Sequence, residues 1–150
     1  MSTAHKLEPQ TLPFDCEHAL HLYLLNNLES LEPGLTLYGK ENLDGLQFKC
    51  LGKKLDLLAE DREGGLVAIE IKFNYGTPES LGQILGYLAV IRRLRRFAGR
   101  RLRGLLVCRK ASEHLLLAAE DNGSVAVYEY TPGLRFLHAL EALSPIHIPE

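Results

Sequence analysis

Residues 54–87 read KLDLLAEDREGGLVAIEIKFNYGTPESLGQILGY and contain the strongest secondary-structure signals of the chain. One strand-like segment, 53–60, is separated from a second, 66–72, by Arg62-Glu63-Gly64-Gly65, whose glycines suit the positive φ of a hairpin turn. Thr77-Pro78-Glu79 then combines a helix N-cap, a proline at the first helical position and an acid in the first turn. The stretch therefore predicts an antiparallel hairpin followed by a helix.

Upstream segments extend this pattern. Asp15 suits the N-cap of a helix that runs to about Glu29, with leucines recurring at helical spacing. Residues 35–41 alternate as a strand, whereas 42–52 fits either a further strand or a loop. The strands up to residue 72 are expected to form an antiparallel meander.

Downstream segments predict helical crossovers. The helix that follows the hairpin is expected to end near Gly99, and residues 102–108 form a continuous apolar run, typical of a strand buried on both faces. Residues 112–120 predict a helix and 125–130 a strand, while 134–140 fits either an edge strand or a final helix. The order predicts an α/β fold with a mixed central sheet flanked by helices.

Composition is that of one globular domain. The chain has 150 residues and a formal net charge of −2, so contact with a polyanion would need a local basic patch. We expect residues 1–14 to form a flexible arm, residues 15–140 the folded domain and residues 141–150 an extended tail.

The cysteines and the N-terminus indicate a cytoplasmic protein. Cys16, Cys50 and Cys108 show neither CxxC nor zinc spacing and lie among apolar neighbours, which favours buried reduced thiols. The N-terminus lacks the apolar segment of a signal peptide, and no apolar run has the length of a membrane span. We therefore expect no membrane partner.

The hairpin carries candidate metal ligands. Asp56 lies in its first strand and Glu70 in its second, and Mg²⁺ usually takes one or two carboxylates with water and phosphate oxygens. Two adjacent carboxylates repel each other, and a bound cation removes that cost. Lys72 shares a strand face with Glu70, where an ammonium group can orient water and offset transition-state charge. Taken singly, each residue has a structural explanation. Asp56 could cap the end of a strand, and Lys72 could be a solvated charge at a sheet edge.

The following helix adds a polar pair. Gln83 and Tyr87 are four residues apart and so share one helical face. The glutamine can hydrogen-bond to water or phosphate, and the tyrosine can donate to a phosphate oxygen or stack on a base. Ordinary packing of Tyr87 is the alternative interpretation.

These residues together resemble the PD-(D/E)XK nuclease superfamily and, more narrowly, the catalytic domain of NucS/EndoMS-type endonucleases. The similarity spans roughly residues 15–130. The stretches that carry it are 31–35 (LEPGL), 56–59 (DLLA) with Asp61, 67–72 (VAIEIK), Gly82-Gln83 and Tyr87-Leu88.

The resemblance implies a restriction-endonuclease-like fold and hydrolysis of DNA phosphodiester bonds by water with Mg²⁺ or Mn²⁺, in DNA repair. The catalytic residues that it implies are Asp56, Glu70, Lys72, Gln83, Tyr87 and Glu17. Asp56 and Glu70 would hold the metal, and Lys72 would assist the water. Gln83 and Tyr87 match the QxxxY element of RecB-type nucleases. Glu17 is equally explained as a first-turn carboxylate that favours the helix dipole.

The sequence departs from the family pattern at two points, and the second bears on partners. Leu55 stands where the superfamily has a proline before the first acid. NucS proteins also carry an N-terminal DNA-binding and dimerising domain, which has no counterpart in the residues before the first predicted helix. We therefore expect a free-standing nuclease core, a homodimer, or a subunit whose partner supplies a DNA-binding surface.

A cluster of arginines follows the Gln83 helix. Its members are Arg92, Arg93, Arg95, Arg96, Arg100, Arg101 and Arg103. Cations are favoured at a helix C-terminus, but guanidinium groups also match phosphate geometry, so we expect Arg92, Arg93, Arg96 and Arg100 to contact the nucleic-acid backbone. The histidines show no metal-ligand spacing, and none is expected to be catalytic; His18 and His21 fit a solvent-facing position.

A second class of function is a non-catalytic nucleic-acid-binding or adaptor module that keeps the nuclease-like fold. The intact Asp56, Glu70 and Lys72 argue against it, because such a module has no need for a clustered acid pair. RNA is a further candidate substrate, since no feature of the sequence separates it from DNA.

Overall fold

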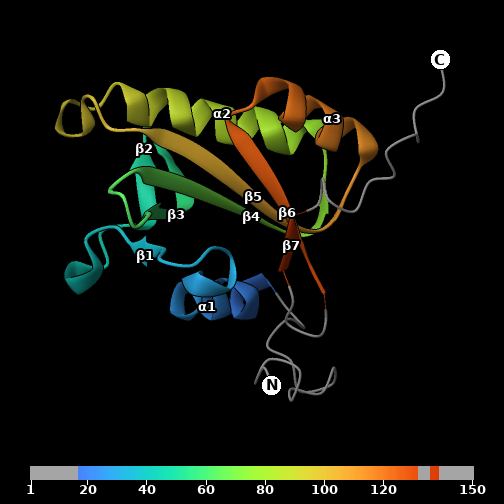
Figure 1. Ribbon diagram of the computed structural model, residues 1–150, viewed down its shortest axis with the longest axis horizontal. Helices are drawn as coiled ribbons and strands as arrows, with labels where there is room; N and C mark the ends of the chain where they lie inside the picture. The colour runs from blue at the N-terminus through green and yellow to red at the C-terminus, as the bar shows by residue number, and fades with distance from the viewer. Residues whose placement is uncertain (1–16, 132–135, 139–150) are drawn as a thin grey trace.

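The computed structural model describes residues 17–131 and 136–138. The expected N-terminal arm, the N-cap at Asp15, Cys16 and the expected tail at 141–150 lie outside the described residues. Within the described part, seven strands form one mixed sheet that has helices on both faces (Figure 1). This is the predicted α/β architecture.

The sheet has the order β1-β3-β4-β5-β6-β7, and β2 also pairs with β3. The neighbours β4–β5 and β5–β6 are parallel, and the other pairs are antiparallel. Parallel neighbours need a crossover, which the helices between them supply. The strands are β1 (Thr36–Leu37), β2 (Leu46–Cys50), β3 (Lys53–Glu60), β4 (Leu66–Gly76), β5 (Leu102–Ala111), β6 (Val125–Tyr130) and β7 (Phe136–His138).

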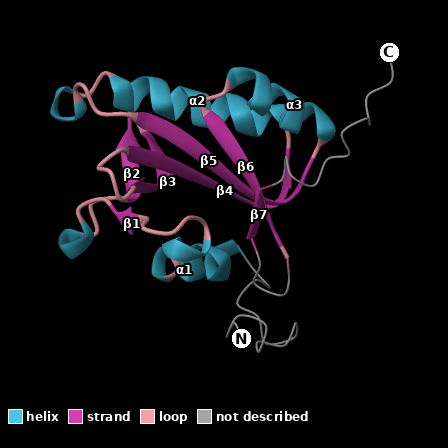
Figure 2. Cartoon of the chain, in the orientation of Figure 1, coloured by secondary structure: helices cyan, strands magenta, loops and turns pink. Residues whose placement is uncertain are grey.

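The helices form two layers. Helices α2 (Pro78–Arg92) and α3 (Glu113–Asn122) cover one face of the sheet, and α1 (Glu17–Asn26) lies against the other (Figure 2). Short 3₁₀ turns follow α1, β1 and α2, at η4 (Leu28–Ser30), η5 (Lys40–Asn42) and η6 (Arg95–Phe97).

The predicted hairpin is β3–β4. Its register runs from Glu60 opposite Leu66 to Leu57 opposite Ile69, and Gly64 takes φ +85° in the turn. Side-chain alternation then divides the sheet between two cores. Val67, Ile69 and Ile71 pack toward α1, whereas Ala68 packs toward α2 and α3. β5 contributes buried side chains to both cores, as its continuous apolar run predicts.

Both crossover helices begin at the predicted caps. The Thr77 amide donates to Ser80 Oγ at 3.1 Å, with Pro78 at the first helical position of α2. The Leu115 amide donates to Ser112 Oγ at 3.1 Å, and α3 ends at Asn122, followed by the C-cap Gly123 with φ +82°. Local sequence therefore decides where these helices start.

Several predicted boundaries are wrong. The strand expected over 35–41 is limited to β1, because Gly39 takes φ +58° and turns the chain into η5. The first helix stops at Asn26 rather than about Glu29. Helix α2 ends at Arg92 rather than near Gly99, and the break lets Phe97 pack into the core.

The two segments whose sequence fits more than one structure both contain a strand. Residues 42–52 contain β2, and the chain near residue 137 forms the strand β7 rather than a helix. Cys50 and Cys108 are buried free thiols, as expected. Among the helices of the described residues, none combines the length and apolar character needed to cross a bilayer.

Candidate active site

The site lies where the β3–β4 ladder opens. The last register pair is Leu57 with Ile69, and beyond it carboxylates replace backbone partners. The Ile71 amide of β4 donates to Asp56 Oδ2 at 2.7 Å, and the Asp56 amide of β3 donates more weakly to Glu70 Oε1 at 3.4 Å. Each acid is therefore held by a backbone N–H of the opposite strand, and the two carboxylates meet across the opening.

Glu70 is unusual in its burial. Only 4% of it is exposed, and it is the one charged side chain in the buried interior of the described residues. The Asp56 side chain is 13% exposed. Ionised carboxylates are almost never buried without a partner, so this pair needs a compensating positive charge.

The acid pair is protonated more readily than free carboxylates. Burial, followed by the negative charge of Asp56, raises the pKa of Glu70 to about 7, although the nearby Lys72 opposes the rise. Burial also raises the pKa of Asp56, and the Ile71 N–H and His21 oppose that shift. Near neutral pH the acid pair is therefore protonated in a fraction of the molecules. A divalent cation that binds both carboxylates would displace that proton.

Lys72 joins the acids from the same strand. Its Nζ lies 3.6 Å from Glu70 Oε2, and its side chain is 32% exposed. It lines a cavity of about 310 Å³ together with Glu17, Asp56, Glu70 and residues 71 and 73–75. The structure thus brings Asp56, Glu70, Lys72 and Glu17 to one cavity.

His21 is a site residue that sequence reasoning missed. Its Nδ1 lies 3.8 Å from Asp56 Oδ1 and its Nε2 3.7 Å from Glu17 Oε2, while Nε2 has no hydrogen-bond partner in the described structure. The side chain is 20% exposed, so the solvent-facing placement is wrong. The signal was available, because Glu17 and His21 are four residues apart and share a face of α1.

Gln83 and Tyr87 do not line the cavity. Tyr87 is buried, and its hydroxyl donates to the Lys54 carbonyl at 3.1 Å, two residues before Asp56. Burial, and then the charge of Glu70, raises the pKa of this phenol, while a hydrogen bond with Gln83 opposes the shift. The pair therefore positions the strand that carries Asp56.

The donor set fits a hard divalent cation. Among the described residues, no three His, Cys, Asp or Glu side chains are grouped closely enough to hold a metal by themselves. Structural zinc usually needs four such ligands, whereas Mg²⁺ keeps several waters and accepts one or two carboxylates. Asp56 and Glu70 meet the second requirement.

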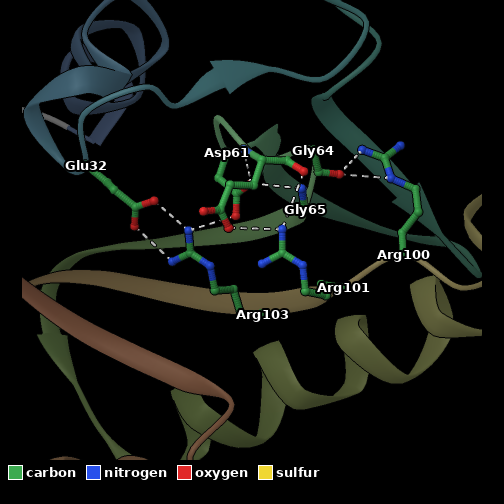
Figure 3. Close-up of polar contacts among 8 residues, drawn as sticks. Glu32, Asp61, Gly64, Gly65, Arg100, Arg101 and Arg103 are labelled. Carbon is green, nitrogen blue, oxygen red and sulfur yellow. Dashed lines mark hydrogen bonds and ion pairs between the residues drawn. The ribbon is translucent and has the colours of Figure 1, made fainter.

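Three of the clustered arginines are engaged within the protein (Figure 3). Arg103 on β5 donates to both carboxylate oxygens of Glu32, the longer contact being 2.9 Å, and lies 3.3 Å from Asp61. Arg100 pairs with Glu60 at 2.7 Å and donates to the Gly64 carbonyl. These contacts tie the β3–β4 turn to β5 and to the segment after α1.

The other arginines lie at the same end of the sheet. Arg92 and Arg93 are exposed at the end of α2, and Arg96 lies over the Phe97 and Phe48 rings at 5.1 and 5.4 Å. The Leu66 amide donates to the Arg101 carbonyl, which places the cluster beside the start of β4. Glu70 lies four residues further along β4, roughly 13 Å away. The phosphate contacts expected of Arg92, Arg93, Arg96 and Arg100 stay a prediction.

Comparison with known proteins identifies the fold. No protein-family model and no curated protein matches the chain. Among solved structures, a repair endonuclease from Pyrococcus abyssi matches with a TM-score of 0.66 and 18% identity over 79% of this chain and 48% of that one. EndoMS bound to double-stranded DNA matches with a TM-score of 0.63 and 19% identity, over 75% of this chain and 43% of that one. EndoMS in its apo form matches with a TM-score of 0.63 and 21% identity, over 78% of this chain and 47% of that one.

The likeness shows the fold. The described structure has the nuclease-like α/β fold of NucS/EndoMS repair endonucleases, so the fold that the sequence motifs imply is confirmed. The chain spans less than half the length of each of these structures.

Proposed function

We propose that this chain is a PD-(D/E)XK-type nuclease that hydrolyses DNA phosphodiester bonds with a divalent metal and water. The observation that carries the proposal is the burial of Glu70 beside Asp56, with Lys72 at the same cavity. A buried pair of acids, placed where the β3–β4 ladder opens, lowers the stability of the fold unless a bound cation compensates their charge.

Asp56 and Glu70 would hold Mg²⁺ or Mn²⁺. Such an ion polarises a phosphoryl oxygen and makes bound water a stronger nucleophile. The two acids lie on neighbouring strands and are fixed by the Ile71 and Asp56 amides, so their separation is set before any ligand arrives. Preorganised charge of this kind reduces the reorganisation needed during reaction.

The remaining side chains position water and charge. Lys72 is near enough to the cavity to stabilise negative charge on phosphoryl oxygens or to orient the attacking water. Glu17 and His21 approach from α1, on the side of Asp56. Tyr87 acts indirectly, through the Lys54 carbonyl.

DNA is the proposed substrate because one structural neighbour is a complex of EndoMS with double-stranded DNA. That neighbour is more than twice as long as the matched part of this chain. We propose that a second copy of the chain, or a partner subunit, contributes further contact with DNA.

The test is cleavage of a substrate panel: single-stranded, duplex, flapped and mismatched DNA, and RNA. Each substrate is incubated with Mg²⁺, Mn²⁺ or EDTA. Asp56→Asn and Lys72→Ala should abolish metal-dependent cleavage. The matched controls are Asp121→Asn and Lys40→Ala, which change exposed residues away from the cavity and should cleave like the parent.

Calorimetry with Mn²⁺ separates the two classes of function. Binding by the parent that is lost in Asp56→Asn supports the nuclease. Binding of DNA without cleavage on any substrate, together with no Mn²⁺ binding, would overturn the proposal in favour of the adaptor module.

A further inference from the structure

The β2–β3 hairpin has an unusual tip. Cys50 pairs with Lys53, so Leu51 and Gly52 form a two-residue loop, and both take positive φ, +48° and +81°. A loop of this kind favours Asn-Gly, because leucine adopts positive φ only with strain. Leu51 is also 87% exposed. Neither the backbone nor the core of this protein explains a leucine here.

Three lysines surround that leucine. Lys49 and Lys54 lie directly opposite each other in the ladder, and Lys53 begins the second strand. All three are exposed, and like charges facing across a strand pair repel each other. None of them forms an ion pair within the described residues, unlike Arg100, Arg101 and Arg103. Their charge is available to an external anion.

The hairpin leads into the candidate active site. Lys54 is two residues before Asp56, so it lies about 7 Å from it along the strand. The Tyr87 hydroxyl donates to the Lys54 carbonyl and so ties β3 to α2 one residue pair below the loop. A ligand held by the lysines would therefore be placed beside the acid pair.

We infer that the β2–β3 hairpin contacts duplex DNA, with Lys49, Lys53 and Lys54 on phosphates and Leu51 inserted as a wedge into the minor groove. Apolar side chains that enter a base step from the minor groove unstack it and bend the duplex. Binding of single strands usually relies on aromatic stacking platforms, which the tip lacks. The inference rests on the proposed function, and it adds a surface that would bend DNA beside the site of cleavage.

The experiment measures binding and bending of a 30-base-pair duplex labelled at both ends with a donor and an acceptor dye. All proteins carry Asp56→Asn, so that the duplex stays intact in Mg²⁺. Leu51→Asn introduces a residue that is suited to positive φ and removes the apolar wedge. Leu43→Asn is its matched control, since Leu43 is also exposed and has φ +56°.

We expect Leu51→Asn to weaken duplex binding about tenfold, the scale of losing one buried leucine contact, and to abolish the rise in energy transfer that reports bending. Lys49→Gln and Lys53→Gln should each reduce the slope of log K against log salt by about 0.9. Leu43→Asn and Lys40→Gln should behave like the parent.

Unchanged bending and affinity in Leu51→Asn would overturn the inference, even if the chain cleaves DNA. Leu51-dependent bending by a chain that never cleaves would support the inference and defeat the proposed function. Binding to vesicles containing phosphatidylserine that requires Leu51, with duplex binding unaffected, would assign the hairpin to a lipid surface and overturn the inference.

Discussion

Replacing Glu70 by glutamine removes a buried charge while keeping the shape of the side chain. In the metal-free protein, Glu70 is 4% exposed and faces Asp56, and its pKa rises from 4.5 to about 7. Ionisation of Glu70 in the folded state is therefore unfavourable. Because glutamine cannot ionise, we expect Glu70→Gln to be more stable than the parent at pH 8 in EDTA.

The sign and size of this stability difference follow from the linkage between protonation and folding. Between pH 4.5 and about 7 the folded protein keeps a proton that the unfolded chain releases, so the free energy of unfolding falls as pH rises. At about 1.4 kcal/mol per pKa unit, the rise corresponds to an upper limit of about 3 kcal/mol. The difference is smaller than this limit because Glu70 shares the proton with Asp56 and the site relaxes locally. We therefore expect Glu70→Gln to exceed the parent in unfolding free energy by about 1–2 kcal/mol.

The assay is urea unfolding of both proteins in EDTA at pH 5, 6, 7 and 8. The difference in unfolding free energy should grow in favour of Glu70→Gln as pH rises. Glu120→Gln changes an exposed carboxylate on α3 and should show no such trend. In Mn²⁺ the order should reverse, because only the parent gains stability from metal binding.

A stability difference that does not vary between pH 5 and 8 would contradict this prediction, as would a Glu70→Gln protein that is less stable than the parent at pH 8 in EDTA. Either result would mean that Glu70 is already well compensated by Lys72 and the Asp56 amide. The burial of Glu70 would then no longer indicate that a cation binds at this site.

Three further predictions concern other parts of the fold. Arg103→Ala should lower the free energy of unfolding by about 1 kcal/mol in denaturant titrations, since it breaks a partly exposed contact with Glu32 and Asp61. Gly86→Ala should raise it by up to about 1 kcal/mol, because an added Cβ meets nothing within 4 Å on the exposed face of α2; a loss of stability would contradict this. His21→Ala should slow metal-dependent cleavage about tenfold or more at pH 7 while leaving duplex affinity unchanged, and a parent-like rate would exclude His21 from the reaction.

Much of the fold could be predicted from local patterns. The starts of α2 at Thr77-Pro78 and of α3 at Ser112 do not depend on tertiary contacts, because a cap satisfies backbone amides within one turn of the same segment. Strand alternation places Glu70 and Lys72 on one face. The boundary at Gly39 was not predictable because glycine takes positive and negative φ about equally, and here its φ is +58°. The end of α2 at Arg92 depends on distant residues, because Phe97 is buried against Tyr38 and Phe48.

The candidate site divides in the same way. Local sequence patterns are enough to predict that two acids and a lysine lie on adjoining strands of a hairpin, because alternation and turn length are local properties. Three features of the site depend on tertiary packing: the ladder opens after Leu57 and Ile69, His21 of α1 reaches Asp56, and Leu51 is exposed. Burial, charge pairing and exposure depend on which elements pack together, and no single segment carries that information.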